Sequence, residues 1–265
     1  MAGDTPCSIL NAQAPLAGSA PVSQSWLIVF HQGAWGDRPV DTLISGDLAT
    51  WAKEQGAQIL IARTPKGIDP YPQATFLYSN GQSDLLQGML NSQGIPDLAN
   101  TQRSKPMLLI CTNGKRDQCC ATFGRSLIGQ CKEVLSPELY GQILECSHLG
   151  GHRFAPTAIW LPENLVLGRL EPQAVADLLE TGSVDSRFIR GNTQLPPAQQ
   201  VVHAFVWPQE ITFLSCEQHD TDFHIDALVN SSSKSFIVTS TPVTTVASCG
   251  GDLKSDTWYH LLTNK

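Results

Sequence analysis

The stretch KPMLLICTNGKRDQCCATFGRSLIGQCKEVL, residues 105–135, contains a strand, a loop and a helix in that order. Its apolar run of strand length is typical of a buried strand, and that strand ends at Cys111. From residue 119 onward, apolar residues recur at helical spacing and predict a helix over 119–135. The paired cysteines Cys119 and Cys120 open this helix, where free N–H groups and the helix dipole favour a thiolate.

A second polar cluster follows in the stretch ECSHLGGH, residues 145–152. The segment 141–148 predicts a strand that delivers His148, and His152 follows four residues later. The two glycines between the histidines allow the tight backbone turns that wrap a ligand. Two thiolates and two imidazoles form a four-ligand set that suits structural zinc, and it also suits a two-iron, two-sulfur cluster of the Rieske kind.

The spacing of the cysteines favours the iron–sulfur cluster over zinc. Zinc fingers usually begin with two cysteines that are two to four residues apart. Here seven or eight residues separate Cys111 from the next cysteines, and such a loop can wrap a larger object. Because neighbouring residues on a helix point about 100° apart, we expect either Cys119 or Cys120 to be a ligand, but not both.

The rest of the chain predicts mixed α/β structure. Before the cysteine-rich unit, we expect strands at 25–30, 58–63 and 74–79, a helix over 41–55, and a connector over 80–105 with one helical turn. After it, we expect a strand, a turn and a second strand over 155–170, and a helix over 172–182 that ends at a glycine.

The two ends of the chain look different from its middle. Residues 1–22 are rich in Ala, Pro, Ser and Gly and predict an irregular arm, and residues 190–199 predict an irregular stretch. From Ile211 onward, β-branched residues predict a small antiparallel sheet. We therefore divide the chain into an N-terminal α/β region (1–100), a central unit (101–190) and a C-terminal β-rich segment (191–265).

Composition excludes some classes of partner. The 265-residue chain carries a net charge of −7, which argues against nucleic acid because phosphate binding needs a basic face. No apolar run is long enough for a membrane span, and the first residues lack the pattern of a signal peptide, so we expect a cytoplasmic protein. The chain has eight cysteines, and several of them are clustered. In a reducing compartment, such clusters indicate metal binding or redox chemistry rather than disulfides.

Several motifs resemble the sucrase/ferredoxin-like family. The most specific are CTNGKRDQCCATFGR (111–125) and ECSHLGGHRFAPTAIWLP (145–162), followed by GRL (168–170). The early PCS (6–8), AWG (34–36) and the late SCGGDLKSDTWY (248–259) also fit. The resemblance therefore extends over most of the chain.

This resemblance implies a thioredoxin-like ferredoxin unit that carries a [2Fe-2S] cluster. Its ligands would be Cys111 and Cys120, at the family's spacing, with His148 and His152 in place of a later cysteine pair. Cys119 is the rival of Cys120. The implied function is electron transfer or redox sensing with an unidentified redox partner protein. Sucrase activity is not expected, since the sequence singles out no carboxylate pair for glycoside hydrolysis, and whether the chain is an enzyme stays open.

Two other functions compete with the redox carrier. The same Cys and His residues could bind zinc and hold the fold of an interaction module. Alternatively, Cys119 or Cys120 could react as a thiol oxidoreductase, although the chain lacks a Cys-x-x-Cys motif.

The remaining cysteines and histidines match no ligand spacing. Cys7 lies in the predicted arm and is expected to be incidental, while Cys131 and Cys146 are expected to pack in the core. Core or surface roles are likewise expected for the four ligand-type residues of the C-terminal segment, which are Cys216, His219, His224 and Cys249.

Overall fold

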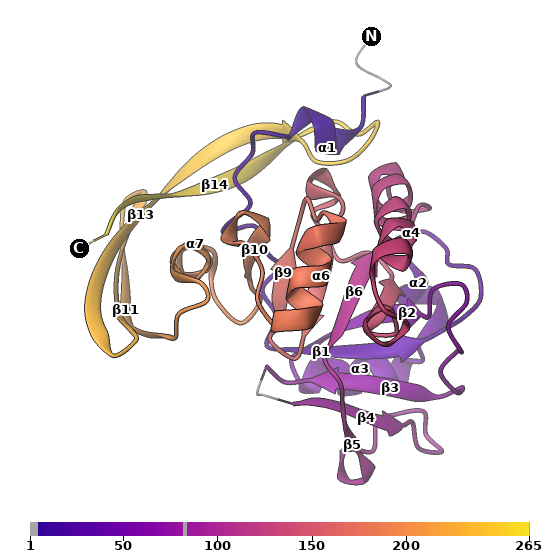
Figure 1. Cartoon of the computed structure of the whole chain (residues 1–265). Coiled ribbons are helices and arrows are strands. Elements are labelled where there is room, and N and C mark those ends of the chain that lie inside the picture. Colours follow the sequence, from indigo (N-terminus) through magenta and orange to yellow (C-terminus); the bar gives the residue numbers. More distant parts are fainter. Residues whose placement is uncertain (1–4, 82–83, 265) are drawn as a thin grey trace.

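The structure is a computed structural model that describes residues 5–81 and 84–264. Within these residues the chain forms one ten-stranded mixed sheet with helices packed on it, and a separate four-stranded antiparallel sheet (Figure 1). The expectation of a mixed α/β fold with a C-terminal β-rich segment is therefore confirmed.

The first part of the large sheet comes from the N-terminal region. Here β1 (Ser25–Phe30) lies parallel to β2 (Ala57–Arg63) and antiparallel to β3 (Thr75–Ser79). The sheet continues outward through β4 (Leu85–Met89) and β5 (Gln102–Ser104). The predicted connector over 80–105 thus contributes two strands as well as its short helical turn, η1 (Leu98–Asn100).

The helix predicted over 41–55 is divided in two. The structure has α2 (Pro39–Leu43) and α3 (Gly46–Glu54), separated at Ser45. Ser45 has extended backbone angles, and its hydroxyl accepts a hydrogen bond from the Leu48 N–H group. A serine in this position caps the start of a new helix, so its side chain outweighs the continuous apolar spacing.

The second part of the large sheet is built around the cysteine-rich stretch. Strand β6 (Met107–Cys111) lies parallel to β7 (Ile143–Cys146) and antiparallel to β8 (Ala158–Leu161). Beyond β8 the sheet ends with β9 (Leu165–Leu167) and β10 (Ile189–Asn192). Because β7 also pairs with β2, both predicted units share one sheet. The division of the chain at residues 100 and 190 stays a prediction.

Alternation along β6 assigns its side chains to two faces. Leu108 and Ile110 join the core formed with α4 (Arg125–Val134) and α6 (Pro172–Thr181). Leu109 and Cys111 belong to the core on the opposite face. The cysteine at the end of the strand therefore points away from the two large helices.

The helix predicted over 119–135 begins with an irregular turn. Residues Cys120–Gly124 form a π-helical turn, η2, which continues into α4. At Gly124 the helix lies directly against the end of β6, because a Cβ atom there would collide with the main-chain oxygen of Cys111. Single π-helical turns occur frequently at functional sites, and here the turn holds Cys120 beside Cys111.

The C-terminal segment forms the second sheet. The strands β11 (Ile211–His219), β12 (Asp222–Val229), β13 (Ser232–Val246) and β14 (Leu253–Asn264) follow one another as a meander. Helix α7 (Pro197–Val206) packs on this sheet through Val202, where the sequence predicted an irregular stretch up to residue 199. A proline at the first helical position starts this helix, and proline is well suited to that position.

The long β13–β14 ribbon reaches back over the N-terminal arm, as Figure 1 shows. The arm contains the short helix α1 (Cys7–Leu10). It is tied to the ribbon by Asn11, whose Nδ2 atom donates to the Val246 oxygen at 2.9 Å. Arg169 holds the arm from the other side by donating to the Asn11 and Ala14 oxygens, both at 2.7 Å. The predicted irregular arm is therefore fixed in place at both sides.

We expect Gly124→Ala to lower the free energy of unfolding by about 1–3 kcal/mol, because the added methyl group forces α4 away from β6. Gly129→Ala is the matched control, since it lies in the same helix with no atom within 4 Å of the added carbon. That control should stabilise the chain by up to about 1 kcal/mol. Guanidinium unfolding of the metal-free protein measures both, and equal effects would contradict the close packing.

A second prediction concerns His203 in α7, where burial lowers the pKa from 6.5 to about 4. Between these two pH values, His203 binds a proton in the unfolded chain but not in the folded chain. The contribution of His203 to the free energy of unfolding is full above pH 6.5. It decreases as the pH falls toward 4, by about 3 kcal/mol in total. Unfolding curves of the wild type should lose stability more steeply over that range than those of His203→Leu, and parallel losses would contradict it.

Candidate metal centre

Two cysteines and one histidine meet at the end of β6. The ligand atoms of Cys111, Cys120 and His148 all lie within 4.8 Å of one another, and both cysteines are 1% exposed. Cys111 comes from the strand end and Cys120 from the π-helical turn, while His148 follows β7 in the neighbouring loop. Because β6 and β7 are parallel neighbours, their C-terminal ends lie at the same edge of the sheet.

The loop between the two histidines turns sharply. Gly150 and Gly151 have φ angles of 84° and 70°, which disfavour residues with a side chain. This turn brings the ring of His152 to within 5.1 Å of the ring of His148, measured between centroids. The structure therefore brings together the ligand atoms of Cys111, Cys120 and His148, and it places His152 beside His148 but outside that group.

Three of the four imidazole nitrogens in this group lack a hydrogen-bond partner in the described part of the chain. Nδ1 of His148 and both ring nitrogens of His152 are buried without a hydrogen bond among the described residues. A contact of 3.5 Å joins His152 Nε2 to the carboxylate of Asp117. Buried polar atoms are almost always hydrogen-bonded, so each exception needs an explanation. Free imidazole nitrogens beside two thiols are what a metal centre requires.

The two thiols have opposite acidities. A hydrogen bond from the Cys120 side chain holds the pKa of Cys111 well below its usual value, against the effect of burial. The same bond, together with burial, raises the pKa of Cys120. Burial lowers the pKa of His152, which favours the neutral imidazole. These shifts favour a thiolate at Cys111 and a neutral imidazole at His152, which are the forms that bind a metal.

A buried arginine adds positive charge to the site. Arg190 is 2% exposed, and its guanidinium donates to the Gly150 oxygen at 2.9 Å. Burial lowers the pKa of Arg190 to about 9, while Cys111 and Cys120 act to raise it. Among the described residues no carboxylate forms an ion pair with this guanidinium, and its charge interacts with the two cysteines and also with Arg153 and Asp256.

The donor set fits both metals considered. Two buried sulfurs and two half-buried imidazoles, with ring nitrogens that lack hydrogen-bond partners, can hold either a [2Fe-2S] cluster or a zinc ion. The site is a candidate for redox or metal-binding chemistry. Cys146, expected in the core, is fully buried in the apolar cluster beside Cys111, and burial raises its pKa well above the usual value.

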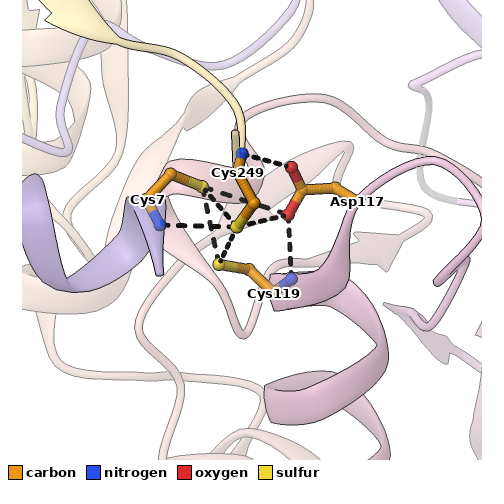
Figure 2. A group of neighbouring side chains, drawn as sticks. All are labelled: Cys7, Asp117, Cys119 and Cys249. Atoms are coloured by element: carbon orange, nitrogen blue, oxygen red, sulfur yellow. Dashed lines mark hydrogen bonds between the residues drawn. The ribbon is translucent and has the colours of Figure 1, made fainter. Parts of the chain in front are cut away.

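Cys119 lies in a different group from Cys120. Its sulfur is 3.5 Å from that of Cys7 and 3.1 Å from that of Cys249, and the carboxylate of Asp117 lies among them (Figure 2). The expectation that Cys7 is incidental does not hold, because this residue is fully buried. Cys249 also has a defined place that spacing did not suggest. The PCS and SCGG motifs were the available sequence signal for both.

Comparison with known proteins assigns the family. The model of the sucrase/ferredoxin-like family matches residues 16–193. The match spans more than half of the chain and includes the four predicted ligand residues. The chain belongs to the sucrase/ferredoxin-like family, as its motifs predicted.

Two curated relatives match part of the chain. Both are named "Altered inheritance of mitochondria protein 32". The one from Debaryomyces hansenii is 30% identical over 102 residues, which is 36% of each protein. The one from Meyerozyma guilliermondii is 29% identical over 90 residues, which is 32% of each. The match thus spans about a third of the length of these relatives.

A solved structure also resembles the chain. It is a thioredoxin-like [2Fe-2S] ferredoxin from Aquifex aeolicus, at 15% identity and a TM-score of 0.29, over 34% of this chain and 94% of that one. A likeness at this TM-score carries no argument about the site.

Among the described residues, no helix has the length and apolar character needed to cross a membrane.

Proposed function

We propose that Cys111, Cys120, His148 and His152 bind a [2Fe-2S] cluster, and that the chain transfers single electrons or senses redox state. The observation that carries this proposal is the set of buried imidazole nitrogens without partners beside two buried thiols. Each unsatisfied buried group costs about 1–3 kcal/mol, a cost that metal coordination would remove. Membership of the sucrase/ferredoxin-like family gives independent support.

The cluster would supply one-electron chemistry, and the protein residues would set how easily the electron is added. Two neutral imidazoles in place of two thiolates make the site less negative than an all-cysteine ferredoxin, which favours a higher reduction potential. The buried charge of Arg190 acts in the same direction. The low exposure of Cys111 and Cys120 keeps water from their sulfurs, which strengthens both effects.

Such a function requires a donor and an acceptor, so we propose a redox partner protein and no nucleic-acid partner for this acidic chain. We also propose a reducing compartment, the cytoplasm. The chain has eight cysteines, and six of them lie in or directly beside the two groups of metal-ligand residues. Oxidising compartments favour disulfides between such neighbours.

The adjacent cysteines provide a matched test. After anaerobic purification, Cys120→Ser should lose bound iron and acid-labile sulfide, because its sulfur belongs to the proposed ligand set. Cys119→Ser should keep two irons and two sulfides per chain, as in the wild type. Metal and sulfide analysis with visible spectra measures the result.

The zinc alternative gives a different outcome in the same experiment. A colourless wild-type protein that holds zinc at these four residues and resists iron–sulfur reconstitution would replace the redox function by a structural one. Equal loss of iron in both cysteine variants would contradict the choice of Cys120 over Cys119.

The role of Arg190 can be measured as a potential. Arg190→Met should lower the midpoint potential of the loaded protein by roughly 50 mV, since it removes a buried positive charge close to the thiolates. Arg190→Lys keeps the charge and is the control, so it should stay close to the wild-type value. Protein-film voltammetry gives both values, and an unchanged potential in the methionine variant would show that this charge does not act on the site.

A further inference from the structure

A second group of metal-ligand residues lies next to the proposed cluster. Cys7 comes from α1, Cys119 from the start of the π-helical turn, and Cys249 from the turn between β13 and β14. Their sulfurs lie 3.5, 3.1 and 3.6 Å apart in the three pairs. Figure 2 shows the carboxylate of Asp117 pointing into the same space.

The carboxylate is held by main-chain groups. Asp117 Oδ1 accepts a hydrogen bond from the Cys119 N–H at 2.8 Å, and Oδ2 accepts one from the Cys249 N–H at 3.0 Å. Oδ1 also lies 3.4 Å from the Cys249 sulfur and 3.9 Å from the Cys7 sulfur. The Asp117 side chain is 1% exposed, so its direction is fixed and its charge is poorly solvated.

These separations match the edges of a tetrahedron around one metal ion. With Zn–S bonds of about 2.3 Å and a Zn–O bond of about 2.0 Å, tetrahedral geometry puts sulfurs about 3.8 Å apart and sulfur and oxygen about 3.5 Å apart. The sulfur pairs, at 3.1–3.6 Å, are tighter than this, so a bound ion would move the three sulfurs slightly outward. All three sulfurs are mutual neighbours, which is the arrangement around a single ion.

Burial explains why a cation belongs there. Cys7 and Cys119 are at most 1% exposed, and Cys249 is half-buried. Among the described residues, no lysine or arginine forms an ion pair with Asp117, and the basic group that contacts it is the imidazole of His152, with Nε2 at 3.5 Å. A divalent cation would supply the missing positive charge and release the thiol protons.

We propose that Cys7, Asp117, Cys119 and Cys249 bind one zinc ion at a site separate from the iron–sulfur ligands. Three thiolates and one carboxylate fill four positions, which is the closed set of a structural zinc. This assignment uses none of the four residues proposed for the cluster and does not depend on the cluster being present.

The zinc would join three distant segments of the chain. It would fix the N-terminal arm and the β13–β14 turn to the start of the π-helical turn, one residue before Cys120. Arg153 and Asp256 already link the ribbon to the histidine loop by an ion pair of 2.7 Å. Zinc binding would therefore hold the ribbon over the histidine loop and shield that side of the proposed cluster.

A disulfide is the main alternative to a zinc site at these sulfur atoms. The sulfurs of Cys119 and Cys249, 3.1 Å apart, could form one if an oxidant such as a peroxide accepted two electrons and both thiol protons were released. That alternative leaves Cys7 and the buried carboxylate of Asp117 without a role, whereas zinc uses all four groups. The disulfide is therefore an outcome of the test below.

The test adds Zn²⁺ alone to the reduced full-length chain under anaerobic conditions, followed by removal of loosely bound metal and counting of zinc and iron on the same sample. The wild type and Cys120→Ser should each keep one zinc per chain. Cys119→Ser and Cys249→Ser should lose it. Cys216→Ser, at an exposed cysteine outside both groups, is the control and should bind zinc like the wild type.

Separate counting keeps the two proposals distinguishable, because Cys249→Ser should lose zinc while its iron content stays at the wild-type level. A chelator should lower the melting temperature of the wild type but not of Cys249→Ser. Three results would overturn the zinc site: no zinc retained by the wild type, wild-type zinc content in Cys249→Ser, or a Cys119–Cys249 disulfide found by mass spectrometry in protein that binds no zinc.

Discussion

The close approach of the π-helical turn to the end of β6 is the contact on which the site depends. Gly124 permits it, because any side chain there would meet the main-chain oxygen of Cys111. The approach places the sulfur of Cys120 beside that of Cys111, in a position that both the sheet and α4 hold rigidly. The parallel pairing of β6 and β7 then brings the histidine loop to the same edge.

Much of this arrangement could be read from the sequence. Apolar runs and helical spacing located β6, β7 and α4. Residues at the ends of parallel strands come together because those ends lie at one edge of the sheet. Cys111 is the last residue of β6 and His148 follows β7, so their proximity was predictable. The break between α2 and α3 was harder to predict, since it depends on one hydrogen bond that Ser45 accepts from the Leu48 N–H and that competes with a continuous apolar pattern.

The meeting of Cys7, Cys119 and Cys249 could not be predicted from residue spacing, for a physical reason. Cys119 is separated from Cys7 by 112 positions and from Cys249 by 130. No local periodicity relates such residues, and their meeting depends on how a long ribbon folds back over an N-terminal arm. Helix α7 illustrates the same limit, because a stretch with two prolines next to Gly and Asn looks irregular until it packs on the second sheet.

The Cys119–Cys120 pair shows how one dipeptide can serve two groups. Adjacent residues on a helix point about 100° apart, so a pair of cysteines cannot easily bind one small centre, yet it can face two. Here Cys120 faces Cys111, and Cys119 faces Cys7 and Cys249. Asp117 lies between the two groups, since its carboxylate reaches Cys249 and also lies 3.5 Å from His152. A change in charge in either group must therefore be felt by the other through this carboxylate, whose surroundings screen it poorly.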